Sequence, residues 1–301
     1  MLRAAIDIGS NSVRLLVADV NGNEFKPLFK CINTTRLHEG LGENNELKGE
    51  PAARTRDAIA DFAKKAREMG VKDDEIRAFA TSAVRDASNG GEFIADVKRK
   101  CDVDIKLLSG DQEARYAFFA AALPDGECGV IDIGGASTEM ICGCGKDVRA
   151  SYSAQMGAVR LRRMMNGDNS VERMLEISEE VLKKGVDAVK PLPDRFVGVA
   201  GTITTLYAMK IKLEKYDPDR IQGGWLGREE VEQQLYRLNA MPVDERKKLP
   251  GISEKRAEII DYGAAILLSF LRITGLNGIY VSDRDNLYSA VMMRDRDEGS
   301  C

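Results

Sequence analysis

The sequence predicts an α/β protein with two domains. The first reason is internal repetition: the segment Ile6–Val17 returns in part as Ile131–Cys142, so that Asp7 is matched by Asp132, 125 residues later. The second reason is that strand-like and helix-like patterns alternate in both halves, which indicates mixed or mostly parallel sheets covered by helices. The length of 301 residues agrees with this, because it suits about two domains that each bury a core.

The first half begins with three expected strands, because its apolar runs are separated by small residues and by the turn Asn21-Gly22. Pro51 then opens a helix whose apolar residues follow the 3.6-residue period, and Gly70 closes it. Shorter apolar runs and periodic stretches complete this half. The expected strands are at 4–8, 13–20, 24–32, 76–81 and 105–108. The expected helices are one at 51–70, a helical stretch that follows the strand 76–81 and runs through residue 96, and one at about 111–123.

The second half restarts the pattern after Pro124-Asp125-Gly126, which is the expected domain boundary. A hairpin is expected after the first strand of this half, and the segment 257–273 is apolar enough to be a buried helix. The domains are therefore placed at 1–124 and 125–301, with the last helix, about 285–301, left free to pack back on the first domain. The expected strands are at 129–133, 196–200 and 277–281. The expected helices are one at 171–190, one that begins at 201, one at 257–273 and a last one that follows the strand 277–281 and ends at about 296.

Composition and charge exclude several classes of protein. The formal net charge of −4 is unlike that of a general nucleic-acid binder, and no apolar run reaches the ~18 residues of a membrane span. Six cysteines without CxxC pairs indicate reduced thiols and a cytoplasmic protein, and the single histidine, His38, argues against histidine triads and multi-histidine metal sites. One basic cluster could meet a polyanion or be a solvated helix face: Arg149, Arg160, Arg162, Arg163, Lys183, Lys184 and Lys190.

The repeated segment has the form of an anion-binding turn. In each copy an apolar strand ends in aspartate, passes through small residues and resumes as an apolar strand, as a β-hairpin does. Small residues leave backbone N–H groups free to point at one anion, and the carboxylates of Asp7 and Asp132 can hold a metal beside it. We therefore expect two such turns, facing each other, to hold a phosphorylated molecule from both sides. The alternative is that each carboxylate only stabilises its own turn, which the repetition disfavours.

Four more spots rich in glycine, serine or threonine lie where a strand pattern meets a helix pattern, beginning at Ala80, Ser109, Ala200 and Ser282. Ligands of open α/β sheets gather at such strand ends, where helix N-termini offer unpaired N–H groups. Any one of these spots is more often a simple helix cap. Their combination with the duplicated turn favours phosphate chemistry.

Three charged side chains stand out near these spots. Glu113 lies in the first turn of its expected helix, where a negative charge is also ordinary helix capping. Arg14 lies close to Asp7 on the next strand, and Arg85 follows the Ala80 spot. A guanidinium binds phosphate through paired hydrogen bonds, although surface arginines are common.

These residues resemble the exopolyphosphatase and guanosine pentaphosphate phosphohydrolase (Ppx/GppA) family in its short two-domain form. That family is part of the actin, Hsp70 and sugar-kinase superfold. The resemblance implies an actin-like (ASKHA, ribonuclease H-like) α/β fold with two domains and an interdomain cleft. The likeness runs from residue 5 to about 290 and is carried by the segments 7–15, 80–85, 109–115, 132–139, 157–161, 201–205, 256–260 and 281–284.

The resemblance also implies roles for individual residues. Glu113 would position or deprotonate the attacking water, and Asp132 and Glu139 would hold Mg²⁺, or Mn²⁺ in its place, with Asp7 nearby. Phosphoryl transfer needs positioning and charge neutralisation more than covalent chemistry, so no histidine is required. The implied phosphate-binding residues are Gly9, Ser10, Asn11, Ser12, Arg14, Arg85, Gly134, Gly135, Ala136, Ser137, Gly201, Thr202 and Arg256.

The sequence departs from the family pattern in three places. The usual third glycine of the second turn is Ala136, which restricts the approach of the backbone to a ligand. The usual pair of acids before Ala-Arg is Gln112-Glu113, which keeps the expected catalytic carboxylate and removes a neighbouring charge. The sequence ends at residue 301 without the helical C-terminal domains of longer members, so processive handling of long polyphosphate is not assigned.

The sequence thus predicts a Mg²⁺-dependent exopolyphosphatase that releases terminal orthophosphate from inorganic polyphosphate, with closure of the domains over the substrate. Hydrolysis of guanosine pentaphosphate (pppGpp) at the same site is the alternative, because no guanine-reading motif is visible. A kinase of the same superfold ranks lower, since no adenine pocket is evident at Gly201–Thr205. A non-catalytic phosphate or alarmone binding regulator also ranks lower, since Glu113, Asp132 and Glu139 are retained. The expected partner is the substrate, with no nucleic acid and no membrane, and a homodimer is left open.

Overall fold

The structure, a computed structural model, describes residues 1–22, 24–37, 39, 45–47, 49–122, 126–145 and 147–293. His38 lies outside the described residues, as do Pro124 and Asp125 of the expected domain boundary. By contacts, the chain divides into two compact units. One comprises Met1–Tyr116 and the helix that starts at Asn286, and the other comprises Ala117–Asp285. This division falls inside a helix, whereas the turn signal Pro-Asp-Gly marks only where that helix must end.

The first unit is built on a five-stranded sheet with the order β3-β2-β1-β4-β5. β1 (Leu2–Ile8), β2 (Val13–Asn21) and β3 (Glu24–Asn33) form an antiparallel meander. β4 (Ile76–Ala80) and β5 (Ile105–Leu107) run parallel to β1. The central strand β1 is apolar and buried over most of its length, while the edge strand β3 is mostly exposed and carries charged residues.

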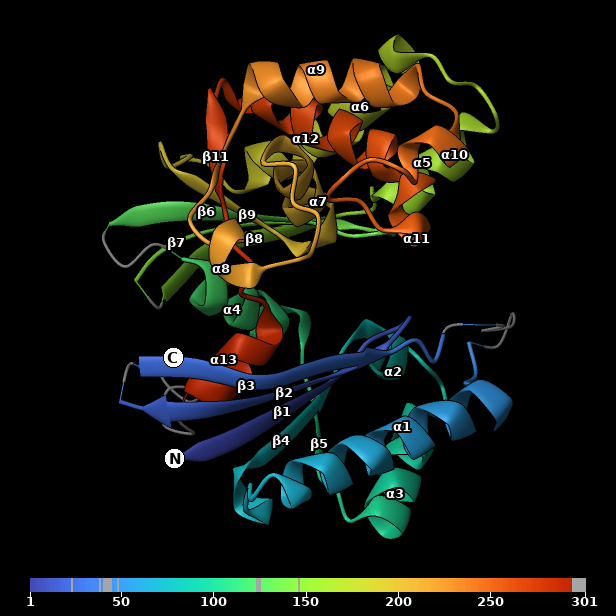
Figure 1. Cartoon of the computed structure of the whole chain (residues 1–301), viewed down its shortest axis with the longest axis vertical. Coiled ribbons are helices and arrows are strands. Elements are labelled where there is room, and N and C mark those ends of the chain that lie inside the picture. Colours follow the sequence, from blue (N-terminus) through green and yellow to red (C-terminus); the bar gives the residue numbers. More distant parts are fainter. Residues whose placement is uncertain are drawn as a thin grey trace. The chain divides into compact units, whose positions relative to one another are not determined.

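Two helices of the first unit, α1 (Gly49–Glu68) and α3 (Gly90–Cys101), lie side by side on one face of this sheet (Figure 1). Pro51 lies in the first turn of α1, where its missing N–H leaves no hydrogen bond unmade. The last helix packs against β1 and β2. The remaining helices are the 3₁₀ turn Asp73–Glu75, α2 (Ser82–Arg85), α4 (Gly110–Ala121), which ends in the second unit, and α13 (Asn286–Met292).

The second unit is built on a six-stranded sheet with the order β10-β11-β9-β6-β7-β8. Its first three strands again form an antiparallel meander, and β9 and β11 run parallel to β6. β10 pairs antiparallel with β11 at one edge. The strands are β6 (Glu127–Ile133), β7 (Thr138–Cys144), β8 (Asp147–Ala154), β9 (Phe196–Val199), β10 (Trp225–Gly227) and β11 (Gly278–Val281).

A buried helix organises the helical layer of the second unit. α12 (Ile260–Thr274) is buried along its first twelve residues, and α6 (Val171–Ala188) and α9 (Arg228–Asn239) pack against it (Figure 1). The rings of Phe270 in α12 and Phe196 in β9 pack edge to face, with their centroids 5.1 Å apart. The other helices are α5 (Ala158–Met165), α7 (Ala200–Lys210), α8 (Pro218–Ile221), α10 (Val243–Arg246) and α11 (Glu254–Ala257).

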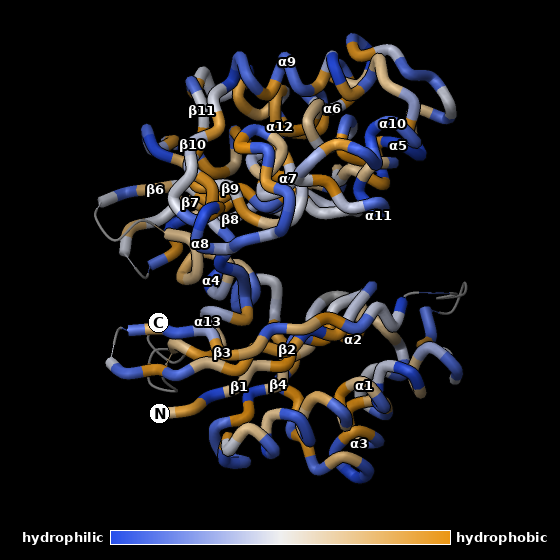
Figure 2. Tube along the Cα trace, viewed as in Figure 1, coloured by the Kyte–Doolittle hydropathy of each residue, from blue (hydrophilic) through white to orange (hydrophobic). Residues whose placement is uncertain are grey.

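The sequence repeat is therefore also a repeat of topology, since each unit has a meander followed by strands parallel to its first strand. The apolar residues of both units concentrate in the central strands and, in the second unit, in α12 (Figure 2). Each unit has its own cluster of buried apolar side chains. Among the helices of the described residues, none combines the length and apolarity that crossing a bilayer requires.

Candidate functional site

The two repeated turns have the same backbone geometry. In the first, the N–H of Gly9 donates to the carbonyl of Ser12 at 3.0 Å, and in the second the N–H of Gly134 donates to the carbonyl of Ser137, also at 3.0 Å. A Cβ atom placed on Gly9 or Gly134 would lie 3.3 Å from that same carbonyl in each copy, so both turns favour glycine at this position. The expected hairpins are thus confirmed, and each follows the first strand of its sheet.

The two hairpins differ in charge at one matched position. In the first unit Asp7 and Arg14 face each other across the hairpin, and Arg14 Nε donates to Asp7 Oδ2 at 3.0 Å, with a second contact from Arg14 Nη2. In the second unit the facing pair is Asp132 and Glu139. Directly opposed residues of neighbouring antiparallel strands hold their Cβ atoms about 5 Å apart. The first hairpin therefore neutralises its own aspartate, whereas the second brings two carboxylates together.

The surroundings of Glu139 favour the uptake of a cation or a proton. Burial raises the pKa of the Glu139 carboxyl above its ordinary value, although hydrogen bonds from Ser137 and Ser153 act in the opposite direction. The Ser153 hydroxyl donates to Glu139 Oε1 at 2.8 Å. Among the described residues, no group of three or more His, Cys, Asp or Glu side chains is arranged to hold a metal. A pair of carboxylates completed by substrate phosphates is nevertheless the usual way in which proteins bind Mg²⁺.

Helix α5 fixes the orientation of the second turn. The N–H of Ala158 donates to the carbonyl of Gly134 at 3.0 Å, and the N–H of Val159 donates to the carbonyl of Gly135 at 2.9 Å. Arg160 Nε donates to the carbonyl of Ala136 at 2.7 Å. In a planar trans peptide the N–H points away from the carbonyl. The amides of Gly135, Ala136 and Ser137 therefore point away from α5, and no acceptor for them is found within the described part of the chain.

A threonine and a glycine bring the third turn to the same sheet edge. Thr202 Oγ1 donates to the carbonyl of Ile133 at 3.0 Å, which ties the start of α7 to the end of β6. Gly263 of α12 allows this approach, because a Cβ there would lie 2.5 Å from Thr202 Cγ2. β9 is parallel to β6, with Val199 opposite Asp132, so both turns lie at carboxyl ends of neighbouring strands. Ala200 begins this turn with φ +64°, a left-handed conformation that is uncommon for a residue other than glycine.

The guanidinium of Arg256 lies flat against Gly201. A Cβ at Gly201 would be 1.6 Å from Arg256 Nη2 and 1.9 Å from Cζ, so only glycine permits this arrangement. Burial lowers the pKa of Arg256, while electrostatic interactions with Tyr216 and Asp132 act to raise this pKa. No hydrogen bond or ion pair of this guanidinium is found among the residues that the structure describes. A desolvated, unpaired cation beside a turn of free amides is suited to bind an anion.

Tyr216, which the sequence does not indicate, and Asp283, which belongs to the expected spot at Ser282, meet at the same edge of the sheet. The Tyr216 hydroxyl donates to Asp283 Oδ1, and burial followed by the charge of Asp283 raises the pKa of Tyr216. Asp283 follows Ser282, whose N–H donates to the carbonyl of Gly198 at 3.0 Å, so β11 also ends here. Ser282 and Asp283 lie where a strand pattern meets a helix pattern, which the sequence shows. Tyr216 lies in a polar loop, and no sequence pattern marks it.

In the first unit, Glu113 and Arg85 meet at the ends of β5 and β4. Arg85 Nη1 lies 3.3 Å from Glu113 Oε2 and also donates to the carbonyl of Leu108 at 3.0 Å. Both side chains are about one-third exposed. This places the proposed water-activating carboxylate beside one of the expected phosphate-binding arginines.

Helix α4, which carries Glu113, is capped by other residues. The N–H of Ser109 donates to Gln112 Oε1 at 3.0 Å, and the N–H of Gln112 donates to Ser109 Oγ at 3.2 Å. This is a reciprocal capping box, and it gives Gln112 a structural role. Glu113 is therefore not needed as a cap, which weakens the alternative explanation of its place in the first turn.

The first turn follows β1, and Glu113 and Arg85 follow β5 and β4. Because these three strands are parallel, the turn lies at the same edge of the sheet as Glu113. Gly9 and Ser12 are half-buried, and Ser10 and Asn11 are exposed. The N–H of Arg36 donates to the carbonyl of Asn11 at 2.9 Å, so the amide of Ser12 points away from Arg36, just as that of Ser137 points away from Arg160.

The basic cluster expected from the sequence is largely occupied by internal contacts. Arg149 donates to the carbonyls of 189–191, and Arg162 pairs with Glu258 at 2.8 Å. Lys183 and Lys190 both pair with Asp187. The two lysines therefore behave as a solvated helix face, and of this cluster Arg160 touches the second turn.

Comparison with known proteins gives consistent matches. The model of the Ppx/GppA phosphatase family matches residues 16–284. The chain is 32% identical over 309 residues to a bifunctional 3-dehydroquinate synthase/phosphatase of Fusobacterium nucleatum, covering 97% of this chain and 46% of that protein, so it spans about half of that relative. It is 30% identical over 307 residues to exopolyphosphatase 2 of Mycobacterium tuberculosis, covering 94% of this chain and 95% of the relative.

Among solved structures, the fold matches that of the Aquifex aeolicus Ppx/GppA family member. The TM-score is 0.90 at 31% sequence identity, and the match covers 100% of this chain and 99% of the other. The crystal structure of the type II variant of the Aquifex aeolicus Ppx/GppA phosphatase gives a TM-score of 0.87 at 31% identity, covering 97% of this chain and 98% of the other. The actin-like α/β fold class expected from the sequence is confirmed.

Proposed function

The chain belongs to the Ppx/GppA phosphatase family, and on this premise we propose that it is a Mg²⁺-dependent exopolyphosphatase of the cytoplasm. The observation that carries the proposal is the sheet edge of the second unit. There the outward-facing amides of Gly135–Ser137, the unpaired guanidinium of Arg256 and the opposed carboxylates of Asp132 and Glu139 lie on neighbouring strand ends. The relative named exopolyphosphatase 2, matched over almost its whole length, supports the choice of substrate.

In the proposed reaction the terminal phosphoryl group of polyphosphate binds to the amides of the turns and to Arg256. Water attacks the terminal phosphorus, Glu113 takes the proton that this water loses, and the bridging P–O bond breaks with its electrons on the leaving chain. Arg85, 3.3 Å from Glu113, keeps that carboxylate in place. Asp132 and Glu139 would hold Mg²⁺, which when bound supplies positive charge to the phosphate oxygens. Asp7, engaged by Arg14, is less suited to be a ligand.

The same residues could hydrolyse guanosine pentaphosphate, because all of them address phosphates and none addresses a base. Release of orthophosphate from polyphosphate and from guanosine pentaphosphate, measured by malachite green with MgCl₂ present, decides between the two. We expect higher kcat/KM with polyphosphate. Release from guanosine pentaphosphate alone would replace the proposal by its alternative, and release from neither would refute both.

Mg²⁺ binding is expected to release protons, in a number that rises as the pH is lowered from neutrality. The reason is that the raised pKa of Glu139 leaves part of this carboxyl protonated in weak acid, and a bound cation lowers that pKa. Calorimetric titration with MgCl₂ in two buffers of different ionisation enthalpy measures the release. Glu139→Gln should abolish the release and weaken Mg²⁺ binding ~10-fold or more, whereas Glu127→Gln, at the far end of the same hairpin, should change neither. Equal release in all three proteins would contradict the assignment.

Gly201→Ala is expected to raise KM for polyphosphate by ~10-fold or more, with little loss of stability. The new methyl group would occupy the place of the Arg256 guanidinium and displace a charge-assisted contact to phosphate, worth ~1.5–3 kcal/mol. Steady-state kinetics measures this, and Gly91→Ala, a glycine of α3 with open space around it, is the matched control. An unchanged KM in Gly201→Ala would show that Arg256 does not contact the substrate.

A further inference from the structure

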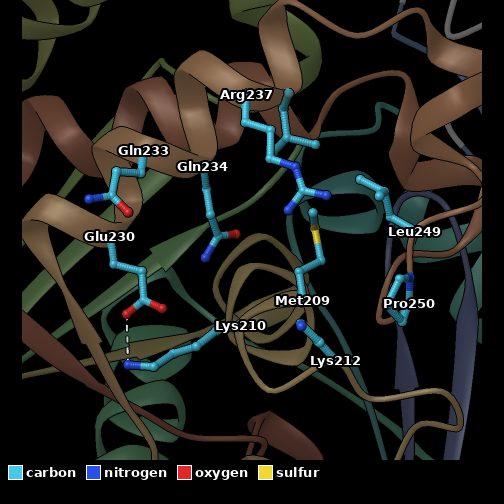
Figure 3. A pocket seen from close by; sticks show the side chains of 10 residues that line it. Met209, Lys210, Lys212, Glu230, Gln233, Gln234, Arg237, Leu249 and Pro250 are labelled. Atoms are coloured by element: carbon cyan, nitrogen blue, oxygen red, sulfur yellow. Dashed lines mark ion pairs between the residues drawn. The ribbon is translucent and has the colours of Figure 1, made fainter.

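A cavity of the second unit lies away from the sheet edge described above. It has a volume of about 310 Å³ and lies at the end of α7, between that helix, α9 and the turn at Leu249-Pro250 (Figure 3). Gly201 and Thr202 stand at the first turn of α7, while Lys210 ends it. An α-helix of this length spans about 15 Å, so the cavity and the phosphate-binding turn are separate sites.

The cavity carries more positive charge than its own carboxylate can balance. Lys210 Nζ pairs with Glu230 Oε2 at 2.7 Å and also donates to the carbonyl of Trp225 at 2.9 Å. Lys212 and Arg237 line the same space, and neither has a carboxylate partner within the described part of the chain. The lining therefore holds two positive charges in excess, and Figure 3 shows Arg237 reaching from α9 towards the end of α7.

The walls of this cavity are held in place by specific contacts. Gly251, with φ +87°, lets the adjoining turn lie against α7, since a Cβ there would be 2.5 Å from the backbone carbon of Ala208. Gln234 Nε2 donates to the carbonyl of Leu206 at 3.2 Å, which ties α9 to α7. The Oε1 atom of Gln234 is buried, and no hydrogen-bond partner for it is found among the residues that the structure describes. Met209 and Leu249 add apolar surface to the lining.

Helix electrostatics offers a competing explanation for these cations. Lys210 and Arg237 lie in the last turns of α7 and α9, where positive charge complements the helix dipole. That effect acts on each helix separately, and it does not require the side chains to share a cavity. It also does not account for Lys212, which lies beyond the end of α7.

We propose that this cavity is a second binding site, for a small phosphate monoester. Two excess positive charges match the charge of about −1.5 to −2 that a phosphate monoester carries at neutral pH. Arg237 and Lys212 would bind the phosphoryl oxygens, and the glutamine amides and apolar walls would receive the body of the ligand. The volume is at the lower end of the range of ~300–1,000 Å³ for small-molecule sites, which limits the ligand to about the size of a mononucleotide.

Calorimetric titration of the intact protein with AMP and with ribose 5-phosphate tests the proposal, with adenosine and ribose as uncharged controls. Both phosphorylated probes should bind and both uncharged ones should not. Arg237→Gln and Lys212→Gln, made separately, should each weaken binding at least tenfold. Lys183→Gln, which removes an exposed lysine of α6, should leave it unchanged. Thermal unfolding shows that each variant is folded, and Lys212→Gln provides the test if Arg237→Gln is not.

Arg256→Gln separates the two sites. Binding that survives in Arg256→Gln and weakens in the cavity variants establishes the second site, whatever the outcome of the polyphosphate assays. The absence of binding to the parent protein, or binding that only Arg256→Gln removes, would overturn the proposal. Equal binding of adenosine and AMP would also overturn it, because the cations would then have no part in recognition.

Discussion

Glu113→Gln is expected to lower kcat for phosphate release from polyphosphate by about 10²- to 10⁴-fold, with KM almost unchanged. A positioned general base contributes about this much to a rate, and glutamine keeps the shape of glutamate but cannot accept a proton. The contact with Arg85 is also weakened, since a neutral amide replaces one partner of the 3.3 Å ion pair. Steady-state kinetics at saturating polyphosphate measures the effect.

Asp111→Asn is the matched control for this variant. Asp111 is exposed and lies in the same first turn of α4, so its loss removes the same helix-dipole interaction without touching Arg85. We expect Asp111→Asn to keep parental activity and to lose only a few tenths of a kcal/mol in stability. If Glu113→Gln were as active as Asp111→Asn, Glu113 would be a structural residue and the proposed mechanism would lose its base.

Arg246→Met is expected to lower the free energy of unfolding by ~3–5 kcal/mol. Arg246 and Asp261 form a buried ion pair at 2.9 Å, with 7% and 3% of their side chains exposed, and removal of one partner leaves an uncompensated buried charge. Arg246 also donates to the carbonyls of Met241 and Ala257, so it fixes the segment that precedes α12 and carries Arg256. Urea unfolding at neutral pH measures the loss.

The pH dependence of this loss identifies its cause. Burial already raises the pKa of Asp261 in the parent protein, against the lowering effect of Arg246. Without Arg246 the pKa must rise further, so the variant recovers stability relative to the parent as the pH falls and Asp261 takes up a proton. The double variant Arg246→Met/Asp261→Leu removes both charges and should regain most of the loss. A loss that is independent of pH and persists in the double variant would point to packing.

The strands and turns that position the site follow from local sequence patterns. The repeat around Asp7 and Asp132 predicts two hairpins, and the structure gives them identical turn hydrogen bonds. The apolar run at 257–273 predicts a buried helix, which extends from Ile260 to Thr274. Both features depend on residues that are close in sequence, and such features can be read from the sequence.

Residues that act through distant contacts could not be predicted in the same way. The sequence predicts Arg160 only as part of a basic cluster, because its hydrogen bond to the carbonyl of Ala136 depends on how α5 packs against the second turn. Tyr216 comes from a loop after α7 and meets Asp283, which is 67 residues later. β10 has three residues and no alternation of its own, so only its pairing with β11 defines it.

The two hairpins differ in charge at one equivalent position, which is Arg14 in the first hairpin and Glu139 in the second. One copy has a counter-ion directly opposite its aspartate, in the side chain of Arg14. The other copy has a second carboxylate at that place. Under the proposed function, Mg²⁺ would offset this added negative charge, so a chelator would act on the second hairpin and leave the Asp7–Arg14 pair of the first intact.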